Sequence, residues 1–218
     1  MMLLCPPGVY RAQNDTQVLA EVMREGGYVG GRHVLDLGTG SGALALTAAR
    51  LGAASVTAVD LSLRSVTAAW LNARLHRAEV TVRRGDLYGP VLGGRFDLIV
   101  ANPPYVPAAT AVLPRFGMGR CWDAGVDGRA LLDRVCAGAA AQLADGGVLL
   151  LVHSAMCGVD RTVHRLAESG MHASVVERGL IPFGPVLRSR RAMLAARGLI
   201  APDDTLEELV VIEASRVG

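Results

Sequence analysis

Residues 102–105 of this 218-residue sequence, Asn-Pro-Pro-Tyr, directly follow an apolar run and could hold a planar nitrogen. The side-chain oxygen of Asn102 and the carbonyl oxygen of Pro103 accept hydrogen bonds, and the two prolines keep the backbone rigid and extended. Two fixed acceptors can bind both hydrogens of an –NH2 group and raise the electron density on its nitrogen, while Tyr105 offers a flat ring for stacking. The motif therefore predicts a site that presents such a nitrogen as a nucleophile.

A second candidate site is the glycine-rich stretch Asp-Leu-Gly-Thr-Gly-Ser-Gly at 36–42, which ends a short apolar run. Asp60 ends the next run, where an acid can accept hydrogen bonds from ribose hydroxyls. With Ala43 the stretch also fits the loose dinucleotide pattern, so a nicotinamide- or flavin-dependent oxidoreductase stays open. Close backbone approach to a ligand is allowed by the three glycines of this stretch, Gly38, Gly40 and Gly42.

Three acids, each at the end of a different apolar run, favour a nucleoside with a positively charged tail over a dinucleotide. Asp36 precedes the first glycine, where a carboxylate is awkward beside a pyrophosphate but suits a ligand with an ammonium group. Asp60 could accept from a ribose, and Asp86, after the third run, could accept from the exocyclic amine of an adenine. A nucleoside with a positively charged amino-acid tail matches this array, and S-adenosylmethionine is such a molecule.

Strands and helices alternate along the chain, and their order brings these motifs together. Alternation of this kind predicts a parallel sheet with helices on both faces, and ligands bind at the carboxyl edge of such a sheet. Apolar runs of strand length occupy 33–38, 55–60, 79–86, 95–104, 147–154, 172–179 and 208–215. Helical spacing of apolar residues is found at about 15–25, 42–52, 63–76, 128–144 and 159–170.

The whole chain, 1–218, is expected to form one domain. An N-terminal helical segment, 1–28, should pack on the core. The stretch between the last two strands, 180–207, is expected to be an irregular, partly helical insert that makes this pair an antiparallel element at one edge of the sheet.

Composition narrows the class of protein. The net charge of +2 requires no polyanionic partner, and all 22 basic residues are arginines. The four cysteines show no metal-type or disulfide-type spacing, so we expect reduced thiols, no metal site and a cytoplasmic location. No apolar stretch approaches the ~20 residues that span a membrane, and the N-terminus does not have the pattern of a signal peptide.

The Asn-Pro-Pro-Tyr motif and the glycine loop together resemble those of class I S-adenosylmethionine-dependent methyltransferases that modify planar –NH2 groups. Within this class the chain resembles the HemK/PrmC family of glutamine-N5 protein methyltransferases, above all its short branch typified by the eukaryotic release-factor enzyme. Residues 8–23 are similar to the N-terminal segment of that branch, and 121–135 to the segment after the motif. The resemblance implies a Rossmann-like α/β fold with a seven-stranded, mostly parallel sheet, an antiparallel edge strand and helices on both faces.

The resemblance also implies a reaction: transfer of a methyl group from S-adenosylmethionine to a protein glutamine amide, with a release-factor-like substrate. In the eukaryotic branch a small partner covers an apolar sheet edge, so such a partner is an expectation here. The catalytic residues would be Asn102, Pro103 and Tyr105, and the substrate would contact Asn102, Pro103, Pro104, Tyr105 and Trp122. The cofactor would contact Asp15, Thr16, Asp36, Gly38, Thr39, Gly40, Gly42, Asp60, Leu61, Asp86, Leu87 and Asn102.

Alternatives remain open at this point. Adenine-N6 methyltransferases of RNA and DNA share both motifs, so an adenine is an alternative acceptor. A small molecule is another. The chain could also be a cofactor-binding module without catalysis. A basic cluster, 188–191 with Arg197, could contact nucleic acid, although a solvated face is the more usual meaning. The loop from Val106 to Asp127 is expected to shape the substrate pocket, and within it Trp122 could equally be a packing anchor. The acceptor, the oligomeric state and the need for a partner do not follow from the sequence.

Overall fold

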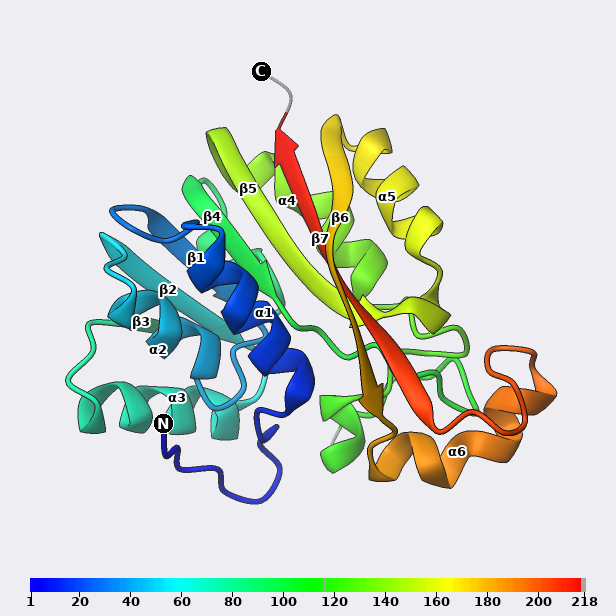
Figure 1. Ribbon diagram of the computed structural model, residues 1–218. Coiled ribbons are helices and arrows are strands. Elements are labelled where there is room, and N and C mark those ends of the chain that lie inside the picture. The colour runs from blue at the N-terminus through cyan, green and yellow to red at the C-terminus, as the bar shows by residue number, and fades with distance from the viewer. Residues whose placement is uncertain (116, 217–218) are drawn as a thin grey trace.

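The computed structural model describes residues 1–115 and 117–216, which form one seven-stranded sheet flanked by helices (Figure 1). The strands are β1 (His33–Leu37), β2 (Ser55–Asp60), β3 (Thr81–Arg84), β4 (Phe96–Ala101), β5 (Leu143–Ser154), β6 (Met171–Pro182) and β7 (Leu206–Arg216). The α-helices are α1 (Asn14–Glu25), α2 (Ala43–Arg50), α3 (Leu63–Leu75), α4 (Leu132–Gln142), α5 (Val159–Glu168) and α6 (Pro185–Ala196). Short 3₁₀ helices occur at Gly89–Val91, Met118–Cys121 and Ala155–Cys157.

The strands follow the order β3-β2-β1-β4-β5-β7-β6 across the sheet, and β1 to β5 are parallel. The chain moves outward from β1 to β3 and then returns to β4 on the other side of β1, so the order reverses between β1 and β4. Ligands of open α/β sheets bind outside the carboxyl ends of the strands at such a reversal. Because Leu37 of β1 pairs with Ala101 of β4, the glycine loop and Asn102 leave the sheet side by side. The predicted fold class is confirmed.

The far edge of the sheet is antiparallel, as expected. β7 runs opposite to both β5 and β6, and β6 is the outermost strand. Both strands are longer than predicted, because β6 continues to Pro182, which pairs with Leu206 at the start of β7. The interval 180–207, expected to be an irregular, partly helical insert, therefore holds two strand ends with the helix α6 between them. A proline is tolerated on an edge strand, but in a sequence it signals that the strand has ended.

The boundary between α4 and β5 also differs from the sequence prediction. α4 is shorter than the expected 128–144, and β5 begins at Leu143 and runs through Gly146 and Gly147, just beyond the expected end of the helix. A Cβ on Gly147 would lie only 2.9 Å from the carbonyl oxygen of Phe96 in β4. Gly147 thus allows a close approach of two strands.

Side chains on the two faces of the sheet enter two hydrophobic layers. One layer joins Val34 of β1 to Leu19 and Met23 of α1 and also includes α2. The other includes α4 and α5 through Leu132 and Leu166, and it continues onto α6. Figure 1 shows α1 in front of the sheet, α4 behind it and α6 beneath the lower ends of β6 and β7. Within the described residues no helix is long and apolar enough to cross a lipid bilayer.

Candidate functional site

The candidate site lies at the carboxyl ends of β1, β2 and β4, the lower edge of the sheet in Figure 1. Asp36 lies in β1 and pairs with Ala58 of β2 and Val100 of β4. Asp60 ends β2, and Asn102 is the first residue after β4. The parallel register of three neighbouring strands therefore brings these predicted site residues to one edge.

Asp36 is completely buried under the glycine loop. Its Oδ2 accepts hydrogen bonds from the Thr39 hydroxyl at 2.6 Å and from the Ala45 N–H, in the first turn of α2, at 2.9 Å. Its Oδ1 has no partner among the described residues. Burial raises the pKa of Asp36 to about 7; the two hydrogen bonds oppose this increase, and nearby Asp60 adds to it. A ligand that brought an ammonium group to this loop would supply the missing donor and favour the ionised carboxylate.

Asp60 joins the ends of the first two strands. Its two carboxylate oxygens accept from the backbone N–H groups of Gly40, at 3.0 Å, and Ser62, at 2.8 Å. Burial raises the pKa of Asp60, and the hydrogen bonds from Ser62 and Gly40 oppose that rise. The loop is tightly folded around this carboxylate: Gly42 has a φ of +87°, and a Cβ there would lie 3.2 Å from Ala69. Each carboxylate oxygen of Asp60 keeps a second lone pair for a ligand hydroxyl.

Asp86 is placed differently from the other two acids. It lies two residues beyond the end of β3, is exposed, and forms an ion pair with Arg134 of α4 at 2.7 Å. Leu87 follows it with a positive φ of 45°, and Leu61, the predicted counterpart after β2, is half exposed. The structure therefore leaves this part of the site more open than the part formed by Asp36 and Asp60.

The Asn102 side chain is oriented by the N-terminal segment. Its Nδ2 donates to the hydroxyl oxygen of Thr16 at 3.2 Å. The Thr16 hydroxyl donates in turn to Oδ1 of Asp15 at 3.2 Å, and the Thr16 backbone N–H donates to the same oxygen at 2.6 Å. Because the NH2 end of the amide is engaged, the acceptor oxygen of Asn102 remains available beside the Pro103 carbonyl.

Tyr105 belongs to the same network. Its hydroxyl donates to Oδ2 of Asp15 at 3.1 Å, and the Tyr10 hydroxyl donates to this oxygen at 2.7 Å. Burial raises the pKa of Tyr105 well above that of free tyrosine, and the neighbouring Asp15 adds to the rise. The Tyr105 hydroxyl therefore stays protonated and is held in place by Asp15, so it does not act as a base. Pro103 is buried and Pro104 half-buried between Asn102 and this ring.

The arginines of the basic cluster hold the loop that follows the motif. Arg190 donates to the Pro107 carbonyl at 2.9 Å and to Asp123 at 2.5 Å. Arg197 donates to the Ala108 carbonyl at 2.9 Å, with further contacts to loop carbonyls. A solvated face was the preferred expectation for this cluster, and for these two residues it was wrong. Loop carbonyls outside any strand need donors, and the side chains of α6 supply them.

Two neighbouring residues, Gly128 and Arg129, also support the motif. A Cβ on Gly128 would lie 2.3 Å from the carbonyl oxygen of Tyr105, so only glycine fits here. Arg129 is 1% exposed and donates to the Cys157 carbonyl at 2.7 Å and to Asp133 at 2.6 Å. No pattern in the sequence singled them out, although both lie in the segment 121–135 that resembles the family's segment after the motif.

A pocket of about 280 Å³ opens beside Tyr105. Trp122 lines it and also packs against the core, as expected for a packing anchor, and its contact with a substrate stays a prediction. The pocket also contains Glu207, a buried acid at the start of β7 that no motif had indicated. The end of β6 and the start of α6 complete its walls.

Comparison with known proteins places this site in a family. Residues 1–115 match the model of the methyltransferase small domain. A protein of Methanocaldococcus jannaschii, named as a protein N5-glutamine methyltransferase, is 30% identical over 177 residues, which are 81% of this chain and 88% of the relative. A release factor glutamine methyltransferase of Xylella fastidiosa is 40% identical over 149 residues, 66% of this chain. The chain spans only about half of that relative, 54% of its length.

Solved structures with the same fold include two informative cases. The Mtq2–Trm112 complex of E. cuniculi, responsible for methylation of the termination factor eRF1, superposes with a TM-score of 0.66 at 21% identity and covers 96% of this chain and 99% of that one. The 16S rRNA N2 G1207 methyltransferase of T. thermophilus, in complex with AdoMet and guanosine, superposes with a TM-score of 0.62 at 25% identity. It covers 97% of this chain and 46% of that one.

Proposed function

The chain belongs to the methyltransferase small domain family and is an S-adenosylmethionine-dependent methyltransferase, and we propose that it methylates the side-chain amide of a glutamine in a protein. The family and cofactor predicted from the motifs are thereby confirmed, which decides against the nucleotide-dependent oxidoreductase. The observation that carries the proposal is the orientation of Asn102, whose amide donates to Thr16 and so keeps its oxygen for an incoming –NH2 group.

The cofactor, when bound, supplies a methyl group on a positively charged sulfur. The residues present suit it: the unpartnered Oδ1 of Asp36 would accept from its ammonium group, with Gly38, Thr39, Gly40 and Gly42 forming the loop around its amino-acid part. Asp60 and Leu61 would hold the ribose, and Asp86 and Leu87 the adenine. Asp15 and Thr16, as the segment that closes on Asn102, would cover the cofactor.

On the acceptor side, Asn102 and the Pro103 carbonyl would accept both hydrogens of the glutamine amide. This grip draws electron density onto the nitrogen and turns its lone pair out of the amide π system. Tyr105 would flank the planar group, with its hydroxyl held by Asp15. Fixing the nitrogen in line with the methyl group can contribute ~7–11 kcal/mol through proximity. No general base is required, because the proton can leave after the nitrogen has become cationic.

Protein glutamine is favoured as the acceptor by the named activities of the relatives. Curated relatives are named as methyltransferases of release-factor glutamine and of a glutamine in ribosomal protein uL3. The arginines that could have bound a nucleic-acid backbone are engaged by loop carbonyls instead, in particular Arg190 and Arg197. A release-factor-like protein is therefore the proposed substrate, and four unpaired cysteines agree with action in the cytoplasm.

A small activating partner is part of the proposal. The related Mtq2 enzyme was solved as a complex with Trm112. In this chain, large apolar side chains are exposed on α3, which packs beside the edge strand β3. They are Leu63, Trp70, Leu71 and Leu75, and they give such a partner an apolar surface.

The substrate is tested by incubating the purified protein with methyl-labelled S-adenosylmethionine and four acceptors: a release factor with a Gly-Gly-Gln sequence, its Gln→Glu variant, tRNA and DNA. We expect label on the release factor and none on the Gln→Glu variant. Label confined to tRNA or DNA would overturn the choice of glutamine and favour an adenine acceptor.

A further inference from the structure

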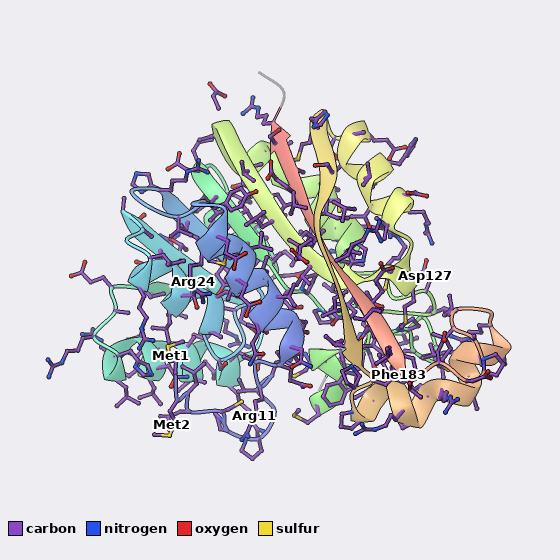
Figure 2. The ribbon with its side chains drawn as sticks, viewed as in Figure 1. Met1, Met2, Arg11, Arg24, Asp127 and Phe183 are labelled. Atoms are coloured by element: carbon purple, nitrogen blue, oxygen red, sulfur yellow. The ribbon has the colours of Figure 1, made fainter. Side chains whose placement is uncertain are left out.

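The pocket beside Tyr105 lies next to the position proposed for the acceptor nitrogen. Tyr105 and Asp15 both line it, and the same two residues belong to the hydrogen-bond network that orients Asn102. The opposite wall comes from the end of β6 and the start of α6, the region of Phe183 in Figure 2. A peptide whose glutamine reaches Asn102 can therefore place a neighbouring residue in this pocket.

Glu207 is an unusual residue for the wall of such a pocket. It is 5% exposed, and its Oε1 is shielded from solvent without a hydrogen-bond partner among the described residues. Burial raises its pKa to about 7; the nearby Ser154 hydroxyl opposes the rise, although the two groups do not reach hydrogen-bond geometry, and Asp15 adds to it. A buried polar group without a partner destabilises a fold, so its presence calls for another explanation.

The surroundings of Glu207 define what could satisfy it. Asp15 is already engaged by Tyr10, Tyr105 and Thr16, so it does not compete for a ligand. Among the described residues that line the pocket none is basic, so they offer no positive charge to an anionic ligand. Most of the remaining wall is apolar or aromatic, with Ile181, Pro182, Val186, Leu187 and Trp122. The ligand that suits this pocket is an uncharged group with one hydrogen-bond donor.

We propose that this pocket is a second substrate subsite, in which a residue beside the acceptor glutamine places an uncharged side chain against Trp122 and donates its backbone N–H to the carboxyl group of Glu207. An extended peptide presents this combination, because its backbone N–H groups are free to bind other chains. The subsite rests on the proposed function and adds a residue that positions the substrate without touching the reacting atoms. Glu207 thus contributes to substrate capture rather than to methyl transfer.

The test compares three variants on a synthetic peptide with one Gly-Gly-Gln sequence followed by leucine. Glu207→Met removes the acceptor but keeps the volume, Glu207→Gln keeps an acceptor oxygen, and Glu208→Gln is the matched control. Glu208 is the next residue of β7, is half-buried and pairs with Arg178 on the surface. We expect Glu207→Met to raise the KM for the peptide about fivefold to tenfold with kcat changed less than about twofold, since one hydrogen bond to a buried acceptor is lost. Glu207→Gln and Glu208→Gln should stay close to the wild type.

A second measurement separates recognition from folding. Peptides that carry one N-methylated backbone nitrogen, at each position next to the glutamine in turn, should show one position where the wild-type KM rises by the same factor. At that position Glu207→Met should show no further rise, because the two changes remove one interaction. The melting temperature of Glu207→Met should equal or exceed that of the wild type.

The outcomes distinguish the subsite from the function. If the peptide is methylated on glutamine and Glu207→Met leaves KM unchanged, or every N-methylated position behaves alike, the subsite is wrong and the proposed function stands. If no glutamine is methylated in the peptide or in an intact release factor, both are overturned. A fall in kcat with unchanged KM would place Glu207 in the transfer step and contradict the capture role.

Discussion

The two halves of the site are built in different ways. On the cofactor side, the hydrogen bonds that shape the loop join residues close in sequence: Asp36 with Thr39 and Ala45, 3 and 9 residues away, and Asp60 with Gly40, 20 residues away. On the acceptor side, the bonds from Asn102 to Thr16 and from Tyr105 to Asp15 join residues 86 and 90 positions apart. One half is a local motif, and the other is assembled from distant segments.

The two halves are therefore vulnerable to different changes. The cofactor loop depends on a strand end, three glycines and two acids, and it should survive changes elsewhere. The arrangement of Asn102, Pro103 and Tyr105 around the acceptor nitrogen requires the N-terminal segment, the motif and α6 to be in place together. Binding of substrate or of a partner protein can therefore change the rate of methyl transfer through this arrangement.

The largest effect is expected from Asn102→Ala, which removes one of two acceptors for the nitrogen. Methyl transfer should fall about 10²- to 10³-fold, the size found when one preorganised hydrogen-bonding group is lost from an active site. Binding of S-adenosylmethionine, measured by calorimetry, should change less than about twofold. A parallel loss of cofactor binding would mean that the two halves are not separate.

The next effect concerns the cofactor half and its pH dependence. Asp36 is fully buried and its pKa is raised from 3.8 to about 7, so the folded protein holds a proton that the unfolded chain releases above pH 4. Its contribution to stability is complete below about pH 4, declines as the pH rises toward 7, and is lost above that. Each unit of raised pKa corresponds to ~1.4 kcal/mol, so the full decline amounts to a few kcal/mol.

Urea unfolding at pH 5 and pH 8 checks this sign. The stability of the wild type should fall relative to that of Asp36→Asn between the two pH values, because asparagine does not ionise. Equal pH dependence of both proteins would show that Asp36 keeps an ordinary pKa.

A smaller effect is expected from Thr16→Val, which takes away the acceptor of the Asn102 amide. The side chain of Asn102 can then rotate. We expect kcat to fall about tenfold, because one hydrogen bond that orients the reacting group is lost. Thr16→Ser should restore the rate, since it keeps the hydroxyl. If valine and serine gave the same rate, the orientation of Asn102 would not depend on the N-terminal segment.

The smallest effect is expected from Arg197→Met, at the C-cap of α6. Loss of its contacts to the Ala108, Ala109 and Val126 carbonyls should loosen the loop and lower kcat/KM for the protein substrate about threefold, with cofactor affinity unchanged. Arg178→Met, on the exposed edge strand β6, is the control and should have no effect. A stronger effect on nucleic-acid binding than on methylation would return α6 to the role of a nucleic-acid surface.

The same division explains what the sequence could predict. The glycine loop, Asp36, Asp60 and the Asn-Pro-Pro-Tyr turn are short-range patterns, and the alternation of strands and helices placed them at one edge. The partners of Arg190 and Arg197 could not be predicted, because charge patterning does not say which distant carbonyls α6 will meet. Glu207 was missed for the same reason, since in the sequence it looks like one of two ordinary acids at the start of a strand.

The chemical nature of the methylated group shows directly whether the acceptor is a glutamine amide. Acid hydrolysis of an enzyme-methylated release factor, with labelled methyl groups, should release the label as methylamine, because hydrolysis of a methylated glutamine amide frees the nitrogen together with its methyl group. Asn102→Ala enzyme should give almost none. Label that stayed on an amino acid such as methyl-lysine, or that appeared on adenine of nucleic acid, would contradict the proposal that the grip of Asn102 and Pro103 serves a glutamine amide.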